Sequence, residues 1–528
     1  MESELFRQLD SKWKTTIKIL LGDEFGSMKE YEKWLLGRNR PRITRKSSVS
    51  GKEVSFVLPD YPQSRILSLE EIDFNQKFAP LTINEVKDID SIAAAVKERA
   101  YYTGNIHLGN SKFIEGSTDI IESFYVYDSG QVSFSKYIAY GYNLEYSECV
   151  FGAMNYGNSS FCTQISNAIK IVRSLEMYSC FDCQDSYYSH RLFNCKNAMF
   201  CFNLRNASHA IGNLKLAPDK YMALKKKLVS EMAAELKKNK SLPSLIDIVG
   251  DTAPDPAIIA EMRGRFKKPK EKPVSRAPIE KAFQSTTGII FGKPLAGVEK
   301  YENWLSEHIR ETRKGISALS GETFVVADHA QYFRYPKNRL VGEEESLFLG
   351  AELSLGEKDL EGLSLKNVGS RIGKIAFFRP GYEEGKLSNN IESIMNVDVT
   401  NAFRSVLNLQ SKNCAYNYYM LECESMFGCN SARKSAFLIH CYNSARMNRC
   451  FEVDSSRDCS DAYFCQNCEN VQSAMFSFNQ KNKRNIIGNA EYSKEEYAKI
   501  KNALCAQMSG ELEKTHALRH SIFSIGND

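Results

Sequence analysis

The sequence lacks the signals of membrane, secreted and common nucleotide-binding proteins. No window of its 528 residues approaches eighteen uninterrupted apolar residues, so we expect no transmembrane helix and no membrane partner. The first residues mix charged and apolar side chains and contain no signal-peptide core, which favours a cytoplasmic protein. A P-loop, a dinucleotide-binding glycine motif and an H-E-x-x-H motif are also missing, which argues against the commonest nucleotide and zinc-hydrolase chemistries.

Cysteine is absent from residues 1–148 and 202–413, although the chain contains 15 cysteines. They crowd into two zones, and without an export signal we expect them to be reduced thiols. The net charge of +5 is a mild excess that does not by itself indicate a nucleic-acid partner. The length predicts more than one domain.

The chain contains an internal duplication. The sequence KEYEKWL at 29–35 returns as EKYENWL at 299–305, and AMFCFNLRNASHAIGN at 198–213 returns as AMFSFNQKNKRNIIGN at 474–489. The separation is 270 residues for the first pair and 276 for the second, so a six-residue insertion aligns the halves. We therefore expect the same elements in each half.

The histidines of the two cysteine-rich zones are not repeated between the halves. The aligned pairs are His190 with Gln466, His209 with Asn485, and His440 with Gln164. A catalytic group that both halves require should recur in both. This mismatch argues against histidine-based catalysis and favours a non-enzymatic protein.

Small residues recur every nine positions, as at Cys441, Cys450, Cys459 and Cys468. We interpret two such nines as one eighteen-residue coil of a flattened β-solenoid, with about five coils in each half. Asparagine and aspartate recur at the third position of the nine-residue repeat, where they suit the bends between strands. The glycine-rich turns of calcium-binding nonapeptide repeats are missing, so no calcium is expected.

The predicted fold is mainly β, with two tandem β-solenoid units of about eighteen residues per coil, built from nonapeptide half-coils. A small α+β module precedes each solenoid, and helices with apolar residues at helical spacing follow it as caps. The predicted segments are 1–119 (α+β segment of the first half), 120–213 (first solenoid), 214–250 (capping helices), 251–278 (basic proline-rich linker), 279–395 (α+β segment of the second half), 396–489 (second solenoid) and 490–528 (capping helices).

Cysteine exchanges with valine, alanine, serine and leucine at aligned positions, which favours a small buried hydrophobe. A zinc or iron–sulfur site stays open as an alternative, with Cys459, Cys465 and Cys468 as its ligands. Structural zinc usually takes two C-x2-C pairs, whereas CFDC at 180–183 and CQNC at 465–468 are single pairs that do not align. We therefore expect no metal and no cofactor.

Basic residues gather after Trp34, after Trp304 and in the linker. Guanidinium groups match phosphate oxygens, so these residues are candidates for contact with RNA or another polyanion. A solvated surface is the alternative. The candidates are Arg38, Arg40, Arg42, Arg45, Lys46, Arg263, Arg265, Lys267, Lys268, Arg310, Arg313 and Lys314.

The segment CSDAYFCQNCENVQSAMFSFNQKNKRNIIGNAEYSKEEYAKI resembles uncharacterised Cys/Asn-rich tandem-repeat proteins of patescibacteria and some archaea. The shared features are C-x-D-x-Y-F, NC-x-N, F-x-F-N-x-[RK]-N and Y-S-K-E-E-Y, and the resemblance covers roughly 120–236 and 396–512. Many of those proteins also carry amino-terminal zinc-binding Cys-x2-Cys pairs, whereas this chain has no cysteine before Cys149. The resemblance implies no activity.

Our leading hypothesis is a non-enzymatic binding or scaffolding protein that presents rigid solenoid faces to a protein or ribonucleoprotein partner. Aromatic side chains in runs such as Tyr416, Tyr418 and Tyr419 are candidate contacts with this partner. One alternative is an RNA- or ribosome-associated protein that uses the linker and arginine clusters, and another is a metal-binding or redox protein that uses the cysteines. A glycosidase would need paired carboxylates, but the nine-residue frame places Glu452 and Asp461 on opposite sides of a coil.

Overall fold

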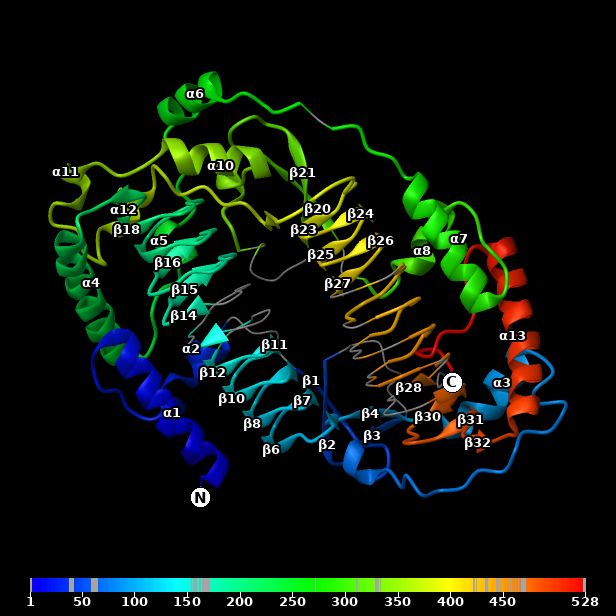
Figure 1. Cartoon of the computed structure of the whole chain (residues 1–528). Helices are drawn as coiled ribbons and strands as arrows, with labels where there is room; N and C mark the ends of the chain where they lie inside the picture. The colour runs from blue at the N-terminus through cyan, green and yellow to red at the C-terminus, as the bar shows by residue number, and fades with distance from the viewer. Residues whose placement is uncertain are drawn as a thin grey trace. The chain divides into compact units, whose positions relative to one another are not determined.

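The computed structural model combines helices with many parallel β-strands (Figure 1). Helices contain 31% and strands 26% of the residues, so the chain is mixed α/β rather than mainly β. The structure describes residues 2–525 except for 38–41, 58–64, 153, 155–158, 161–162, 164–170, 271, 310–311, 328–331, 333, 421–422, 424, 433–434, 443–445, 447, 455, 457, 461, 464 and 467–471.

In the first half of the chain, short strands stack in parallel, and we call this stack the first repeat. One sheet contains β6 (Lys112–Glu115), β8 (Phe124–Tyr127), β10 (Lys136–Ala139), β12 (Glu148–Phe151), β13 (Ser159–Ser160) and β14 (Ile171–Val172). The strands between them also pair with one another, namely β7 (Thr118–Ile121), β9 (Gly130–Ser133) and β11 (Tyr142–Glu145). A further sheet follows with β15 (Leu175–Tyr178), β16 (Tyr187–His190), β17 (Lys196–Met199), β18 (Ser208–Ile211) and the antiparallel β19 (Leu214–Lys215).

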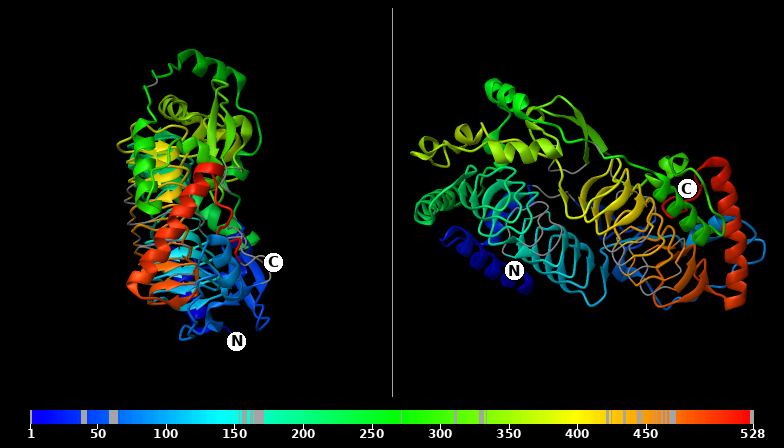
Figure 2. Two further views of the ribbon diagram at one scale, coloured as in Figure 1. Left: turned by 90° about the vertical axis from the view of Figure 1, so that its right-hand side faces the viewer. Right: turned by 45° about the horizontal axis from the view of Figure 1, so that its top comes forward.

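The second half contains an equivalent stack, the second repeat. Its strands are β22 (Glu383–Glu384), β23 (Ile394–Val397), β24 (Thr400–Phe403), β25 (Val406–Leu409), β26 (Lys412–Ala415), β27 (Tyr418–Met420), β28 (Cys465–Gln466), β29 (Gln472–Met475), β30 (Ser477–Phe478), β31 (Arg484–Ile487) and β32 (Ala490–Glu491). The right-hand view of Figure 2 shows successive turns of the backbone lying side by side within each repeat.

One turn of the chain takes twelve residues, so the predicted eighteen-residue coil is wrong. Lys136 pairs with Phe124 on one side and with Glu148 on the other, and Val406 pairs with Ile394 and Tyr418. All of these partners are twelve positions apart.

A three-residue rhythm of the backbone explains the error. Every third residue of the first coils has a left-handed φ, as at Asp119, Glu122, Tyr125 and Asp128. A backbone conformation that recurs at every third residue fits a repeat of nine residues and also a repeat of twelve. The backbone closes one coil after four such steps, whereas the cysteine spacing spans three.

Serine and cysteine occupy the same kind of inward position. Ser123 Oγ donates to the Ile121 carbonyl at 2.8 Å and accepts the N–H of Ser135, twelve residues later, at 3.1 Å. Cys180 Sγ likewise donates to the Tyr178 carbonyl at 3.2 Å and accepts the Leu192 N–H at 3.4 Å. Each described cysteine is buried and outside any disulfide, which supports the interpretation of cysteine as core filling.

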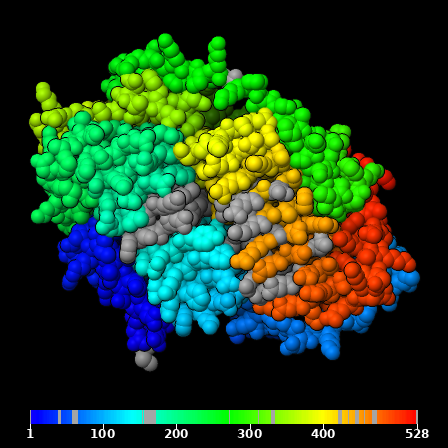
Figure 3. All heavy atoms as spheres, in the orientation of Figure 1, coloured from blue at the N-terminus to red at the C-terminus, as the bar shows by residue number. Residues whose placement is uncertain are grey.

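Long helices flank the repeats. They are α1 (Glu4–Leu21), α4 (Pro218–Asn239), α7 (Ala277–Phe291) and α13 (Lys494–Thr515). Helix α1 packs along β8, β10 and β12, and Figure 3 shows it in dark blue beside the cyan atoms of the first repeat. Helices α4 and α13 coincide with the predicted helical stretches after each repeat, and Ser493 and Glu496 form a capping box at the start of α13. No helix in the described ranges is both long and apolar enough to cross a membrane.

Two small modules complete the fold. The first module, 42–108, holds β1 (Ile43–Lys46), β2 (Glu53–Phe56), β3 (Ile66–Ser68), α3 (Ile89–Val96), β4 (Tyr102–Gly104) and β5 (His107–Leu108). The second module, 312–382, holds β20 (Thr312–Ile316), β21 (Thr323–Ala327), α10 (Glu343–Glu352), α11 (Glu357–Leu360) and α12 (Val368–Ile372). The connecting segments contain α2 (Glu32–Leu36), α5 (Leu245–Val249), α6 (Pro256–Arg265) and α8 (Glu302–Leu305).

Contacts within the chain divide it into two compact units, each assembled from three segments. Unit 1 comprises 1–41, 109–270 and 312–382, and unit 2 comprises 42–108, 271–311 and 383–528. Each unit therefore contains the repeat of one half together with the module of the other half.

Candidate metal centre

One column of the second repeat carries ionisable side chains. Gly428, His440 and Glu452 follow one another at twelve-residue spacing, and the backbone pairs Phe427 with Ile439 in this register. His440 is 2% and Glu452 is 3% exposed. The backbone register thus places Gly428 beside His440, and Glu452 follows His440 at the same spacing in the sequence.

Gly428 makes room for this column. Its φ is 68°, and a Cβ at this position would lie 2.7 Å from the Leu305 carbonyl oxygen and 3.1 Å from His440 Cδ2. A larger residue would push against both neighbours. The glycine therefore allows the segment after α8 and the His440 ring to approach the same coil.

A third ionisable residue, His308, comes from that segment. Its carbonyl oxygen accepts a hydrogen bond from Asn430 Nδ2 at 2.9 Å, which fixes the loop against the repeat. The His308 ring lies 4.7 Å from the ring of Phe523 and 5.8 Å from the ring of His440, between centroids. Trp304 of α8 packs on His440 at 5.1 Å.

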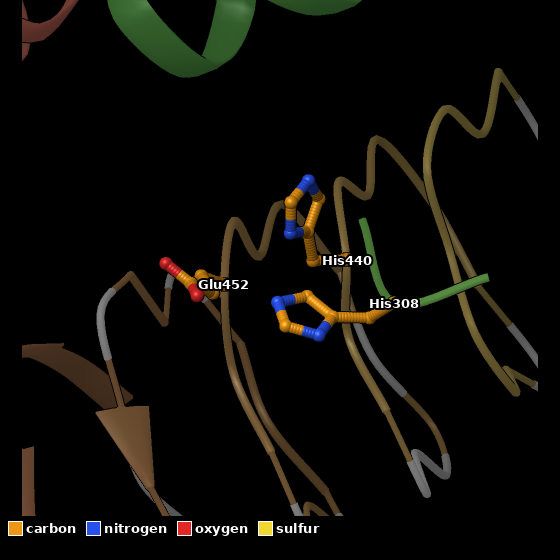
Figure 4. Close-up of side chains that lie close together, drawn as sticks. All are labelled: His308, His440 and Glu452. Carbon is orange, nitrogen blue, oxygen red and sulfur yellow. The ribbon is translucent and has the colours of Figure 1, made fainter. Parts of the chain in front are cut away.

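His308, His440 and Glu452 form the one group of three or more candidate metal ligands found among the described residues. One ligand atom from each side chain lies within 4.8 Å of the other two. Figure 4 shows the two imidazole rings next to each other with the Glu452 carboxylate beside them. All three residues belong to unit 2.

The hydrogen bonds of His440 and Glu452 leave ligand atoms available on these two side chains. Nδ1 and Nε2 of His440 are both buried and have no hydrogen-bond partner within the described part of the chain. Glu452 Oε1 accepts from Ser521 Oγ and from the Ile522 N–H, the latter at 2.9 Å. Both bonds go to the same oxygen, so Oε2 is the atom that can serve a further ligand.

Burial sets the protonation of the group. It raises the pKa of the Glu452 carboxyl to about 7, against the opposing hydrogen bonds from Ser521 and Ile522 and the charge of His308. Burial, followed by the neighbouring His308, lowers the pKa of His440 well below its usual value. His440 is therefore neutral near pH 7, and a neutral imidazole is the form that binds a metal.

The first half retains one member of this group. Glu452 aligns with Glu176, which is fully buried in unit 1, whereas His308 aligns with Arg38 and His440 with Gln164. Arg38 and Gln164 lie outside the described residues. Glu176 Oε2 accepts from Tyr178 Oη at 3.3 Å and from the Leu245 N–H at 3.4 Å. The pair of histidines is thus specific to the second half.

Three of the four predicted polyanion residues of the linker have partners within unit 1. Arg263 donates to the Leu319 carbonyl at 2.6 Å, and Arg265 pairs with Glu261 and Glu352. Lys268 pairs with Glu322 at 2.9 Å, next to the β20–β21 hairpin that carries Arg313 and Lys314. Lys267 is exposed.

The other basic candidates are distributed differently. Arg38, Arg40 and Arg310 lie outside the described residues. Arg45 and Lys46 are on β1, and Arg42 directly precedes it, so these three belong to unit 2. The linker residues therefore lie in unit 1 with Arg313 and Lys314, whereas the β1 residues lie in unit 2.

The cysteines considered as alternative ligands lie in the interior of the second repeat. Cys459 and Cys465 belong to a buried apolar cluster, and Cys465 Sγ donates to the Ala474 carbonyl at 3.2 Å. Cys468 lies outside the described residues. The aromatic residues named as candidate surface contacts, Tyr416, Tyr418 and Tyr419, are 2%, 3% and 6% exposed.

Comparisons with known proteins identify no relative. No family model matches the sequence, no curated protein matches it, and no solved structure matches the fold. The similarity to Cys/Asn-rich tandem-repeat proteins stays a prediction.

Sequence reasoning missed the group of His308, His440 and Glu452. From the sequence, His440 is only an unmatched histidine, and Glu452 is only a poor partner of Asp461, which lies outside the described residues. The twelve-residue spacing of His440 and Glu452 was a signal in the sequence, but it is meaningful only once the coil length is known. His308 carries no such signal, because it comes from a different segment.

Proposed function

We propose that the protein binds a divalent transition-metal ion in unit 2, with His308, His440 and Glu452 as ligands. The observation that carries the proposal is the convergence of two imidazoles and a carboxylate, with ligand atoms within 4.8 Å of one another, around a buried histidine. Two histidines and one carboxylate form a ligand set that zinc and iron(II) sites use.

His440 would gain most from a bound ion, because both of its ring nitrogens are buried without a partner among the described residues. Each buried polar atom without a partner costs about 1–3 kcal/mol, and His440 has two such nitrogens among the described residues. Coordination would satisfy one of them and would use the Glu452 oxygen that accepts no bond from Ser521 or Ile522. A bound cation would also offset the cost of a buried carboxylate.

The ligand types favour an ion that accepts nitrogen ligands. In a tetrahedral zinc site, metal–nitrogen distances of about 2.1 Å place neighbouring ligand atoms about 3.4 Å apart. The ligand atoms, which lie within 4.8 Å of one another, must therefore approach by up to about 1.4 Å through side-chain rotation when they share an ion. Calcium and magnesium prefer all-oxygen ligand sets, so this group suits them poorly.

A binding measurement tests the proposal directly. Metal-free protein is titrated with Zn²⁺ and, without oxygen, with Fe²⁺, and bound metal is quantified by mass spectrometry. The test variant is His440→Gln, because glutamine is the residue of the first half at the aligned position. The control is His209→Asn, which likewise replaces a histidine by the residue of the other half.

We expect about one ion per chain in the natural sequence and in the His209→Asn control, and loss of that ion in His440→Gln. Equal binding by His440→Gln would show that the metal is held elsewhere. Failure of the natural sequence to bind either ion would remove the proposal altogether.

We propose that the two repeats are β-solenoids and that the protein has a binding or scaffolding role around this centre. The twelve-residue register of most strand pairs supports the solenoid interpretation, since each coil then pairs with its neighbours along one axis. Polyanion binding is less well supported, because Arg265 and Lys268 are paired with Glu352 and Glu322.

A further inference from the structure

Each repeat ends in a surface that receives the module of the opposite half. The first module, 42–108, belongs to unit 2 with the second repeat, and the second module, 312–382, belongs to unit 1 with the first repeat. The chain thus passes from one unit to the other before and after each module.

In unit 2, polar contacts join the first module to the end of the second repeat. Asn479 Nδ2 donates to the Tyr101 carbonyl at 2.9 Å, and Thr103 Oγ1 donates to Asn479 Oδ1 at 2.6 Å. The Arg99 guanidinium donates to the Gly488 carbonyl. A Cβ at Gly488 would lie 2.8 Å from a methyl carbon of Val96, so the two surfaces are closely packed.

In unit 1, equivalent contacts join the second module to the end of the first repeat. Asn203 Nδ2 donates to the Phe377 carbonyl at 2.9 Å, and the Leu355 N–H donates to the Gly212 carbonyl at 2.8 Å. A Cβ at Gly212 would lie 2.3 Å from a methyl carbon of Leu355.

The two sets of contacts are related by the duplication. Asn203 aligns with Asn479 and Gly212 with Gly488, both at a separation of 276 residues. The acceptors Tyr101 and Phe377 are separated by the same number. Two aligned asparagines therefore bind two aligned carbonyl groups, one in each unit. In both units the carbonyl belongs to the module of the other half.

We infer that the end of each repeat is a docking surface for the module of the opposite half, and that the protein is a covalently joined, module-exchanged pair of its two halves. The partner for which each surface is built is therefore a second copy of the half-sequence. Because both halves contribute to both units, the linker is not needed to hold the halves together.

Site-specific cross-linking in the full chain tests the exchange. The pair Thr103→Cys and Asn479→Cys is cross-linked under native conditions with a short bismaleimide. A protease site inserted within Lys272–Val274, which is exposed, is then cut before denaturing electrophoresis. The control pair is Thr103→Cys with Asn203→Cys, which would become neighbours if the first module docked on its own half.

The exchange predicts that the first pair joins the two fragments covalently and that the control pair leaves them separate. A cross-link between positions 103 and 203, with no joining of the fragments by the first pair, would overturn the inference.

Cleavage of the chain with the inserted site and no other substitution provides a second measurement that does not depend on buried substitutions. We expect the two fragments to co-elute in equal amounts on a native sizing column and to separate only in denaturant. Elution as two separate folded fragments would contradict the exchange.

Discussion

Two buried histidines in the two repeats differ in how their nitrogens are used. His190 of the first repeat accepts the Arg379 N–H at Nε2, at 3.0 Å, and its Nδ1 lies 3.5 Å from Tyr335 Oη. His440 of the second repeat has no partner for either nitrogen among the described residues. The ring nitrogens of His190 therefore have polar neighbours within the protein, whereas those of His440 can still bind a ligand.

The two aligned glutamates show the same contrast. Glu176 lies beside the Tyr178 hydroxyl, while Glu452 lies beside two imidazoles. Burial alone therefore does not identify a site, since all four side chains are buried or nearly so. What distinguishes unit 2 is the addition of His308 and His440 to a column that keeps its glutamate in both halves.

The largest effect is expected when unit 2 is given the residues of the first half. The double variant His308→Arg/His440→Gln removes two ligands and adds a positive charge, so we expect zinc affinity to fall by more than about 1,000-fold. Isothermal titration calorimetry measures this loss. A circular dichroism spectrum that matches the natural sequence provides the control for folding of the double variant. Retained zinc affinity would contradict the ligand assignment.

The glutamates allow a matched comparison. Glu452→Gln removes the anionic ligand, and we expect metal affinity to fall by more than the roughly 10–100-fold that loss of an outer-shell partner costs. Glu176→Gln makes the same chemical change in unit 1 and should leave metal affinity unchanged. An equal loss in both variants, measured by competition with a chromophoric chelator, would show that the glutamates act on stability and not on the ion.

Substitution of His190 should lower the stability of the protein without changing its affinity for the metal. His190→Gln disrupts the contact with the Arg379 N–H in a buried site, so we expect the free energy of unfolding to fall by about 2–3 kcal/mol. Its metal affinity should not change. Chemical denaturation followed by circular dichroism measures the stability, and a drop in metal affinity for this variant would argue against a site confined to unit 2.

The smallest effects concern the docking surfaces. Gly212→Ala and Gly488→Ala each place a methyl group against the docked module at a left-handed φ, and we expect each to cost about 1–3 kcal/mol. Gly264→Ala on α6 is the control, because nothing lies within 4 Å of its added Cβ. In that helix the change should stabilise by up to about 1 kcal/mol. The midpoints of thermal unfolding rank the stabilities of the three variants. Equal midpoints would contradict close packing of the modules against Gly212 and Gly488.

Much of the fold could be predicted from the sequence. The helices at 218–239 and 494–515, the buried cysteines and the short hairpin strands at 53–56 and 323–327 follow from local patterns of apolar, small and β-branched residues. These patterns act within a few residues of one another, so one sequence is enough to recognise them.

The remainder depends on distances that the sequence does not display. The coil length could not be read from the cysteines, because nine and twelve are both multiples of the three-residue backbone rhythm. His308 meets His440 across 132 positions of sequence, in a contact set by the path of the chain after α8. The exchange of modules leaves no local pattern at all, since either arrangement would use the same residues.

The most direct test of the metal centre is anomalous diffraction at the zinc absorption edge from crystals of zinc-loaded protein. We expect one strong peak within coordination distance of His308, His440 and Glu452, and none in unit 1. A peak on the sulfur atoms of the second repeat, or no peak between the two histidines, would contradict the assignment.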